Sequence, residues 1–158
     1  MIPDVKVARL IDATPEQVFD AFTTPEGQEA FYGQDDPGWI VRSHCDLRVG
    51  GVWTVEFGPS PAELYRHRHV FESIERPHRL LLTCTETRLD GTTLLIKVEL
   101  TFEARGGQTL MTMTQRGIPT AELREEHQRG VPNAVARLER IIQLRLSRTP
   151  IDQRHPAP

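Results

Sequence analysis

The sequence predicts an α+β domain in which a curved antiparallel sheet wraps around a long C-terminal helix, with two short helices after the first strand. Three observations predict this fold. A short β-branched segment near the N-terminus leads into two successive threonine–proline helix starts. Strand-like segments separated by turn signals fill the middle of the chain. The last long segment carries apolar residues at helical spacing.

Length and composition are those of an ordinary globular protein. The 158 residues, 38% of them hydrophobic and 26% charged, fit one domain. We expect this domain to span residues 1–148, with a flexible tail at 149–158. A net charge of −3 gives no electrostatic reason for a nucleic-acid partner or a membrane surface. The chain has only two cysteines, and no charged-then-apolar leader precedes Val5. We therefore expect a reduced, cytoplasmic protein.

Local signals predict the first strand and the two short helices. The segment Val5 to Ile11 is rich in β-branched residues, which favours a strand. The segment Thr14 to Gln17 has a threonine cap, a proline at the first helical position and a glutamine three residues after the cap. Thr24-Pro25 repeats the pattern. A second short helix is therefore expected to end near Gly33.

Strand-like segments follow, and Asp90-Gly91 and Gly106-Gly107 are predicted to be hairpin turns between the last three. From Thr92 to Phe102, apolar residues at even positions alternate mainly with polar residues at odd positions, so one face of this strand is expected to be buried. One face of the sheet therefore needs a cover. The segments are Trp39 to His44, Gly51 to Phe57, Leu64 to Ile74, Leu80 to Thr87, Thr92 to Phe102 and Leu110 to Gln115.

The C-terminal segment supplies that cover. From about Thr120 to Arg148, apolar residues recur at helical spacing, and Leu138 and Ile142 are expected to pack against the buried face of the sheet. Pro132 lacks a backbone donor, so we expect it to interrupt and kink the helix. The strand residues expected opposite Leu138 and Ile142 are Leu94, Ile96 and Val98.

Several short segments follow one another in a characteristic order. They are Ala13 to Phe19 with Phe22, Asp46 to Trp53, Ile74 to Leu80, Thr101 to Glu103, Thr112 to Gln115, and His127 with Gly130 and Leu138-Glu139. In order and spacing they resemble the activator-of-Hsp90-ATPase-homologue (AHSA1-like) group of the START/Bet v 1-like superfamily, also called SRPBCC. The resemblance covers nearly the whole chain up to the tail. It implies a helix-grip fold with a pocket between the sheet and the long helix. Val131-Pro132 and Phe31 to Gly33 depart from the family, whose members often carry tryptophan at these places.

The resemblance implies a fold but does not select one activity, because the superfamily includes hydrophobic-ligand carriers, polyketide cyclases and co-chaperone domains. Our main interpretation is a pocket protein, non-enzymatic or weakly catalytic, that binds a small apolar ligand. The first alternative is a co-chaperone or stress-response interaction domain of the Hsp90-activator type, with a chaperone partner or a homodimer. The second is a cyclase-like or hydrolase-like enzyme that uses pocket histidines. An open cavity would favour ligand binding or catalysis.

Candidate ligand-binding residues come from the strands and from two of the helices. Tyr65, His67, His69 and Phe71 alternate along one strand and therefore share a face. His67 and His69 also have the spacing of metal ligands, but no cysteine or carboxylate at ligand spacing completes a site. We therefore expect no metal and no cofactor. The full set is Phe31, Tyr32, Trp39, Trp53, Tyr65, His67, His69, Phe71, Met113, Gln115, His127 and Val131.

His127 lies on the apolar side of the predicted long helix, between Leu123 and Val131. A polar ring among apolar neighbours needs a hydrogen-bond partner, and the strand residues Glu86 and Gln115 could supply one. A structural bond to the sheet and contact with a bound ligand both stay open. Catalytic residues are not assigned, because catalysis needs titratable groups held within hydrogen-bond reach.

Overall fold

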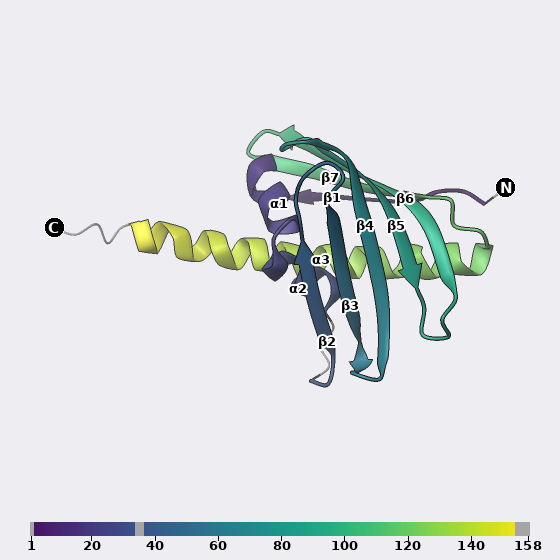
Figure 1. Ribbon diagram of the computed structural model, residues 1–158. Helices are drawn as coiled ribbons and strands as arrows, with labels where there is room; N and C mark the ends of the chain where they lie inside the picture. Colours follow the sequence, from purple (N-terminus) through teal and green to yellow (C-terminus); the bar gives the residue numbers. More distant parts are fainter. Residues whose placement is uncertain (1, 34–36, 154–158) are drawn as a thin grey trace.

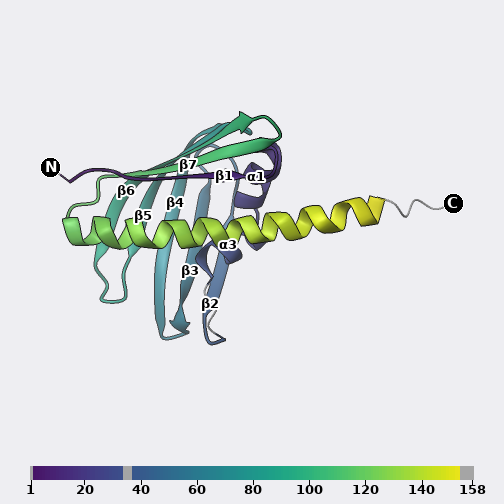
Figure 2. The same ribbon diagram turned by 180° about the vertical axis from the view of Figure 1, so that it is seen from behind.

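A seven-stranded antiparallel sheet curls around one long helix in the computed structural model, which describes residues 2–33 and 37–153 (Figures 1 and 2). The elements are β1 (Val5–Ile11), α1 (Pro15–Phe22), α2 (Pro25–Tyr32), β2 (Ile40–Cys45), β3 (Val52–Ser60), β4 (Glu63–Glu75), β5 (Arg79–Thr87), β6 (Thr93–Arg105), β7 (Gln108–Arg116) and α3 (Ala121–Gln153). The strand order is β1-β7-β6-β5-β4-β3-β2. The predicted fold class, a helix grip, is confirmed.

The two short helices begin at the predicted caps. The backbone N–H of Gln17 donates to Thr14 Oγ1 at 3.3 Å, and the backbone N–H of Thr14 donates to Gln17 Oε1 at 2.9 Å. This reciprocal capping box satisfies two donors that a helix start leaves unpaired. Thr24 Oγ1 accepts from the backbone N–H of Gly27 at 3.3 Å in the same way. The helices therefore form a tight corner between β1 and β2.

The alternation predicted for β6 is also observed. Its even-numbered residues from Leu94 to Phe102 are all buried, and Leu95 on the opposite face is 66% exposed. The hairpin turns on either side of β6 contain Gly91 and Gly106, whose φ angles of 85° and 64° lie in the left-handed region that favours glycine. The buried face of β6 thus points into the concave side of the sheet.

Helix α3 lies across this concave side, and its C-terminal part extends beyond the sheet (Figures 1 and 2). The helix is continuous through Pro132, so the predicted interruption does not occur. It also continues to Gln153, past the expected end at Arg148, and residues 154–158 of the predicted tail lie outside the described residues. Among the described residues, no helix is long and apolar enough to cross a membrane.

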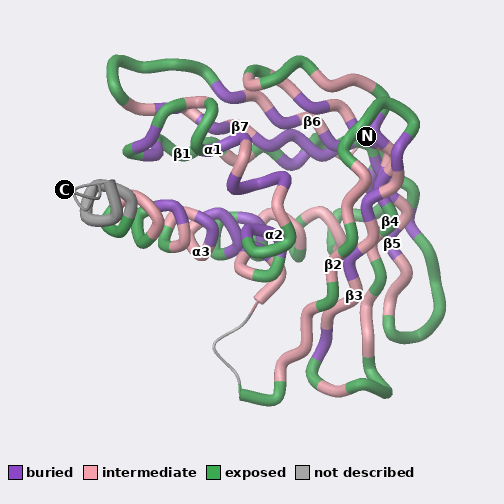
Figure 3. The backbone as a smooth tube through the Cα atoms, turned by 60° about the vertical axis from the view of Figure 1, so that its left-hand side comes forward, coloured by how far each residue is buried: buried purple, intermediate pink, exposed green. Residues whose placement is uncertain are grey.

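Leu138 and Ile142 are buried as predicted, with exposures of 0% and 2%. Helix α3 packs mainly against α2, β1 and α1 rather than against β6. A Cβ built on Gly27 of α2 would lie 3.3 Å from Leu138 Cδ1. Leu138 therefore lies close to α2, and Leu138, Ile142, Ile96 and Val98 all belong to one core cluster. Buried residues line the facing sides of the sheet and of α3 (Figure 3).

Candidate functional site

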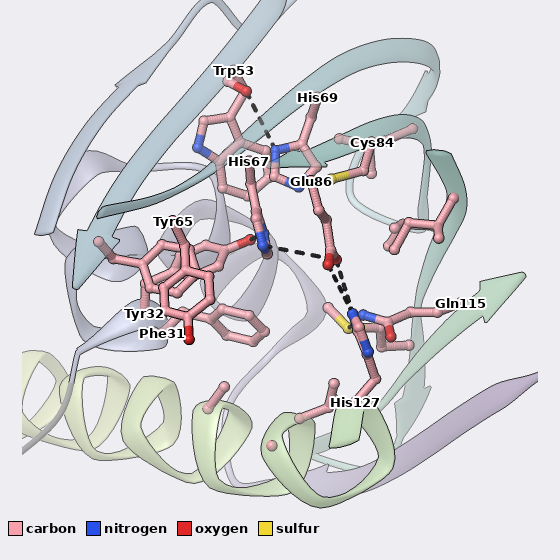
Figure 4. A pocket seen from close by; sticks show the side chains of 18 of the residues that line it. Phe31, Tyr32, Trp53, Tyr65, His67, His69, Cys84, Glu86, Gln115 and His127 are labelled. Atoms are coloured by element: carbon pink, nitrogen blue, oxygen red, sulfur yellow. Dashed lines mark hydrogen bonds and ion pairs between the residues drawn. The ribbon is translucent and has the colours of Figure 1, made fainter. Parts of the chain in front are cut away.

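A cavity of about 300 Å³ lies between the concave face of the sheet and helices α2 and α3 (Figure 4). Strands β3 to β7 and all three helices contribute to its wall, which is largely aromatic and aliphatic. The space is therefore open and is not filled by core side chains. The predicted site residues that line it are Phe31, Tyr32, Trp53, Tyr65, His67, His69, Met113, Gln115, His127 and Val131.

Trp39 and Phe71, the other two predicted residues, do not line the cavity. Trp39 precedes β2, and its indole N–H donates to the carbonyl of Tyr32 at 2.9 Å, so it holds the end of α2 against the sheet. Phe71 shares the strand face of His67 and His69 but is 1% exposed and stacks on Trp53 at a centroid distance of 6.1 Å. Phe71 therefore belongs to the packed core.

Strand pairing places two histidines, a carboxylate and a thiol together on the cavity side of the sheet. In the antiparallel pairing of β4 with β5, His67 lies opposite Glu86 and His69 lies opposite Cys84. Residues directly opposite each other point to the same face of a sheet. Glu86 and His69 are each 5% exposed. These ionisable groups therefore share a desolvated environment in which their mutual effects are strong.

His127 links α3 to β5 through Glu86. Its Nδ1 lies 2.7 Å from the carbonyl oxygen of Leu123, and its Nε2 lies 2.9 Å and 3.1 Å from the two carboxylate oxygens of Glu86. A carbonyl and a carboxylate only accept hydrogen bonds, so both ring nitrogens carry protons and the imidazole is cationic. Burial opposes this charge, but the hydrogen bond and charge of Glu86 and the Leu123 carbonyl outweigh it and raise the pKa of His127.

The pKa of Glu86 is shifted in the direction opposite to that of His127. Burial alone would raise the pKa of this carboxyl group, since it disfavours the charged form. The hydrogen bond and the positive charge of His127 hold the pKa of Glu86 below its ordinary value. Glu86 and His127 therefore form an ion pair with little contact with water.

His67 extends the polar chain from Glu86 to α2. Its Nδ1 lies 3.1 Å from the hydroxyl of Tyr32, and its Nε2 lies 3.7 Å from Glu86 Oε2. Burial lowers the pKa of His67 despite the charge of Glu86, and burial raises the pKa of Tyr32. A neutral imidazole and an intact phenol fit one pattern, in which the Tyr32 hydroxyl donates to Nδ1 and the Nε2–H of His67 faces the carboxylate.

His69 and Cys84 lie on the side of Glu86 away from His127 (Figure 4). The Nδ1 of His69 lies 3.3 Å from the carbonyl oxygen of Trp53, and the imidazole stacks on the indole at 4.5 Å. Burial lowers the pKa of His69 to about 3, so the ring is neutral and its Nδ1–H donates to that carbonyl. Burial also raises the pKa of Cys84. In the described part of the chain, His67, His69 and Cys84 form the one cluster able to hold a metal ion.

Gln115 lines the cavity and carries a buried acceptor. It is 8% exposed, and its Nε2 lies 3.7 Å from Met113 Sδ. Among the residues that the structure describes, its buried Oε1 has no hydrogen-bond partner. A buried acceptor without a partner costs about 1–3 kcal/mol. A ligand donor could satisfy this oxygen.

The predicted ligand-binding set omitted two residues at the centre of this polar cluster, Cys84 and Glu86. A signal for them was present, because Leu80, Leu82, Cys84 and Glu86 share one parity along a strand. A carboxylate at the end of a row of inward-facing residues indicates a functional or paired group. Other wall residues outside the predicted set are Phe22, Phe57, Leu82, Thr87, Arg88, Ile96, Val98, Leu100, Glu126, Gly130, Ala134 and Arg137.

Comparison with protein families gives one match over most of the chain. The model of the family described as activator of Hsp90 ATPase homolog 1-like protein matches residues 12–143. No curated protein gives a significant match.

Solved structures show the same fold. Protein CV1439 from Chromobacterium violaceum is 21% identical with a TM-score of 0.74, over 88% of this chain and 96% of that one. Protein Ms6760 from Mycobacterium smegmatis is 17% identical with a TM-score of 0.71, over 87% and 89%. DynU16, a protein of the dynemicin biosynthetic locus, is 17% identical with a TM-score of 0.71, over 89% of this chain and 47% of that one.

Proposed function

We propose that this chain, which belongs to the family of activator of Hsp90 ATPase homolog 1-like proteins, binds a small, largely apolar molecule in its cavity. The observation that carries the proposal is the composition of the wall. Aromatic and aliphatic side chains form most of it, and the polar groups gather around Glu86 and Gln115. Apolar walls with a few convergent polar groups are typical of small-molecule sites.

The polar groups favour a particular kind of ligand. Gln115 Oε1 is a buried acceptor without a partner in the described chain, and the carboxylate of Glu86 also accepts. A ligand end that donates a hydrogen bond, such as a phenol or alcohol hydroxyl, would satisfy Gln115. An ionised carboxylate would meet the buried charge of Glu86 and leave Gln115 unsatisfied. We therefore expect neutral hydroxyl compounds to bind better than ionised acids of the same size.

A thermal-shift screen tests this proposal. The probes are alkylphenols, alkyl alcohols and fatty acids of matched chain length, added to freshly purified protein whose native mass spectrum is recorded first. We expect alkylphenols to raise the melting temperature of the wild type. Gln115→Met keeps a similar side-chain volume and removes the acceptor, so it should weaken their binding about tenfold, equivalent to about 1.4 kcal/mol. Gln108→Met, in the hairpin between β6 and β7, is the matched control.

The outcomes separate the two parts of the proposal. If no probe raises the melting temperature and the native mass spectrum shows no retained small molecule, the binding function is wrong. If a probe binds the Gln115→Met variant as tightly as the wild type, the placement of its polar end is wrong.

An enzyme using the pocket histidines is a second candidate, and one observation favours it. His127 is cationic and His67 is neutral on either side of the same carboxylate, with pKa values displaced in opposite directions. Two ionisable groups whose pKa values are shifted in opposite directions can act as the acid and the base of a reaction. Incubation with any compound found by the screen, followed by mass analysis, would test for turnover; conversion by the wild type that His67→Gln abolishes would support it.

The family description also names activation of the Hsp90 ATPase, so a co-chaperone role remains an alternative proposal. The large exposed apolar residues of the described chain are spread over β1, the β2–β3 and β5–β6 connections, β6 and α3. A homodimer and a chaperone partner likewise stay proposals. Because the cavity is open, we place ligand binding first.

A further inference from the structure

Three side chains on neighbouring strands form a cluster of soft and borderline metal ligands. A ring nitrogen of His67, a ring nitrogen of His69 and the Sγ of Cys84 all lie within 4.8 Å of one another. The sequence alone showed two histidines with no further ligand. The pairing of β4 with β5 removes that objection, because it sets Cys84 directly opposite His69 on the cavity face.

The surroundings of His69 orient it as a ligand. Its Nδ1–H donates to the carbonyl of Trp53 at 3.3 Å, which leaves the lone pair on Nε2. Within the described residues, no hydrogen bond is made to that Nε2 or to the Sγ of Cys84. Histidines that bind metals usually donate their other ring N–H to a carbonyl or a carboxylate, which fixes the tautomer and the ring orientation. His69 already has this arrangement.

To bind a metal, His67 would adopt its other tautomer, in which Nδ1–H donates to the Tyr32 hydroxyl oxygen and the lone pair lies on Nε2. The Tyr32 hydroxyl lies 3.1 Å from its Nδ1, and its Nε2 is directed towards the Glu86 carboxylate at 3.7 Å. The rings of His67 and His69 lie 6.0 Å apart at 73°, and one nitrogen of each lies within 4.8 Å of the other. The carboxylate next to them adds negative charge that would compensate a bound cation.

We propose that His67, His69 and Cys84 bind a zinc-class divalent cation, with the fourth coordination position facing the cavity. In a tetrahedral zinc site the ligand atoms are about 3.3–3.7 Å apart, given bonds of about 2.0–2.1 Å to nitrogen and about 2.3 Å to sulfur. The three ligand atoms here, all within 4.8 Å of each other, would need inward movements of about 1 Å. Thiolate and imidazole ligands favour zinc over magnesium or calcium, which prefer oxygen.

The open position distinguishes this from a structural zinc site, whose four ligands all come from the protein. It faces the space proposed for the ligand, but metal binding does not depend on that proposal. Three protein ligands and one exchangeable position are the arrangement of catalytic zinc sites. The cation would therefore be accessible to a small molecule in the cavity.

Metal titration tests the site. Protein stripped with EDTA and dialysed is titrated with Zn²⁺ in competition with a chromophoric chelator, and separately with Co²⁺ under anaerobic conditions. We expect one equivalent to bind and the Co²⁺ form to show a thiolate-to-metal charge-transfer band. Cys84→Ser should remove that band and weaken Zn²⁺ binding by more than about tenfold, since losing a first ligand costs at least as much as losing an outer partner.

Matched variants complete the test. Cys45→Ser and His78→Gln change the other cysteine and an exposed histidine, and should leave both the band and the affinity unchanged. His69→Gln should weaken Zn²⁺ binding as Cys84→Ser does; if it does not fold, the band in the wild type and its loss in Cys84→Ser decide the matter. Binding of less than one equivalent, or equal affinity in Cys84→Ser, would overturn the proposal. Alkylphenol binding measured in the presence of EDTA tests the ligand proposal separately from the metal proposal.

Discussion

Nε2 of His127 lies 2.9 Å from Oε1 of Glu86, although the two residues are 41 positions apart and belong to α3 and β5. The contact joins the long helix to the sheet across the cavity wall. Side-chain exposures of 11% and 6% mean that water screens the pair weakly. Removing one member would leave the other as an unpaired charge in a desolvated place.

His127→Phe should therefore destabilise the protein. We expect a loss of about 3–5 kcal/mol in the free energy of unfolding, the usual result of breaking a buried ion pair from one side. Urea denaturation of the metal-free protein measures it. The double variant Glu86→Leu/His127→Phe should recover most of the loss, because it leaves no buried charge behind. Wild-type stability in His127→Phe alone would contradict an ion pair.

The stability that the pair contributes should decline as the pH rises. The folded-state pKa of His127 is raised, whereas in the unfolded chain it lies near about 6.5. A group with a raised folded pKa contributes stability that is fully present below the unfolded pKa and is lost as the pH rises through the folded pKa. The difference in urea midpoint between the wild type and Glu86→Leu/His127→Phe should shrink from about pH 6 to about pH 9. A difference that is constant over this range would rule out protonated His127 as the source.

Elements specified by neighbouring residues could be predicted from the sequence, and contacts between distant elements could not. The caps at Thr14 and Thr24 involve residues three positions apart, and both were correctly placed. The alternation from Leu94 to Phe102 likewise depends only on strand geometry. These local signals were sufficient for the fold class and for ten of the 24 residues that line the cavity.

The composition of the polar cluster depends on strand register. His69 lies opposite Cys84 only because of the length of the turn after β4 and an irregularity between Phe71 and Ser73. A shift of one residue would turn every side chain of a strand to the other face. No spacing within the sequence reveals that choice. The prediction therefore missed Cys84 and Glu86 as the partners of His69 and His67. It also missed the close approach of Leu138 to α2, which depends on where α2 packs.

Leu138→Ala should lower the melting temperature clearly. Leu138 is 0% exposed and contacts α2 near Gly27, so its truncation leaves a void between two helices. Buried Leu→Ala changes cost about 2–5 kcal/mol, and at this chain length each kcal/mol lowers the melting temperature by about 2–4 °C. Leu144→Ala on the same helix, where the side chain is 51% exposed, is the control and should change the melting temperature little. A shift below about 2 °C for Leu138→Ala would show that this helix face is not in the core.

Gly27→Ala should destabilise the corner between the short helices, although alanine is usually favoured over glycine in a helix. A Cβ at this position would lie 1.6 Å from the carbonyl oxygen of Ala21 and 3.3 Å from Leu138 Cδ1. Because the nearest obstacle is backbone, α1 and α2 would have to separate, which also disturbs the packing of α3 against α2.

Gly130→Ala is the matched control for this change. It also replaces a helical glycine, but a Cβ there meets nothing within 4 Å. Alanine is favoured over glycine in a helix interior by about 0.8–1.0 kcal/mol, so Gly130→Ala should raise the free energy of unfolding slightly. Gly27→Ala should lower it by about 1–3 kcal/mol, the usual cost of overpacking. Chemical denaturation of the two variants beside the wild type measures both changes. If they move stability in the same direction by similar amounts, helix propensity outweighs the close approach of α1 to α2, and the packing described for this corner is wrong.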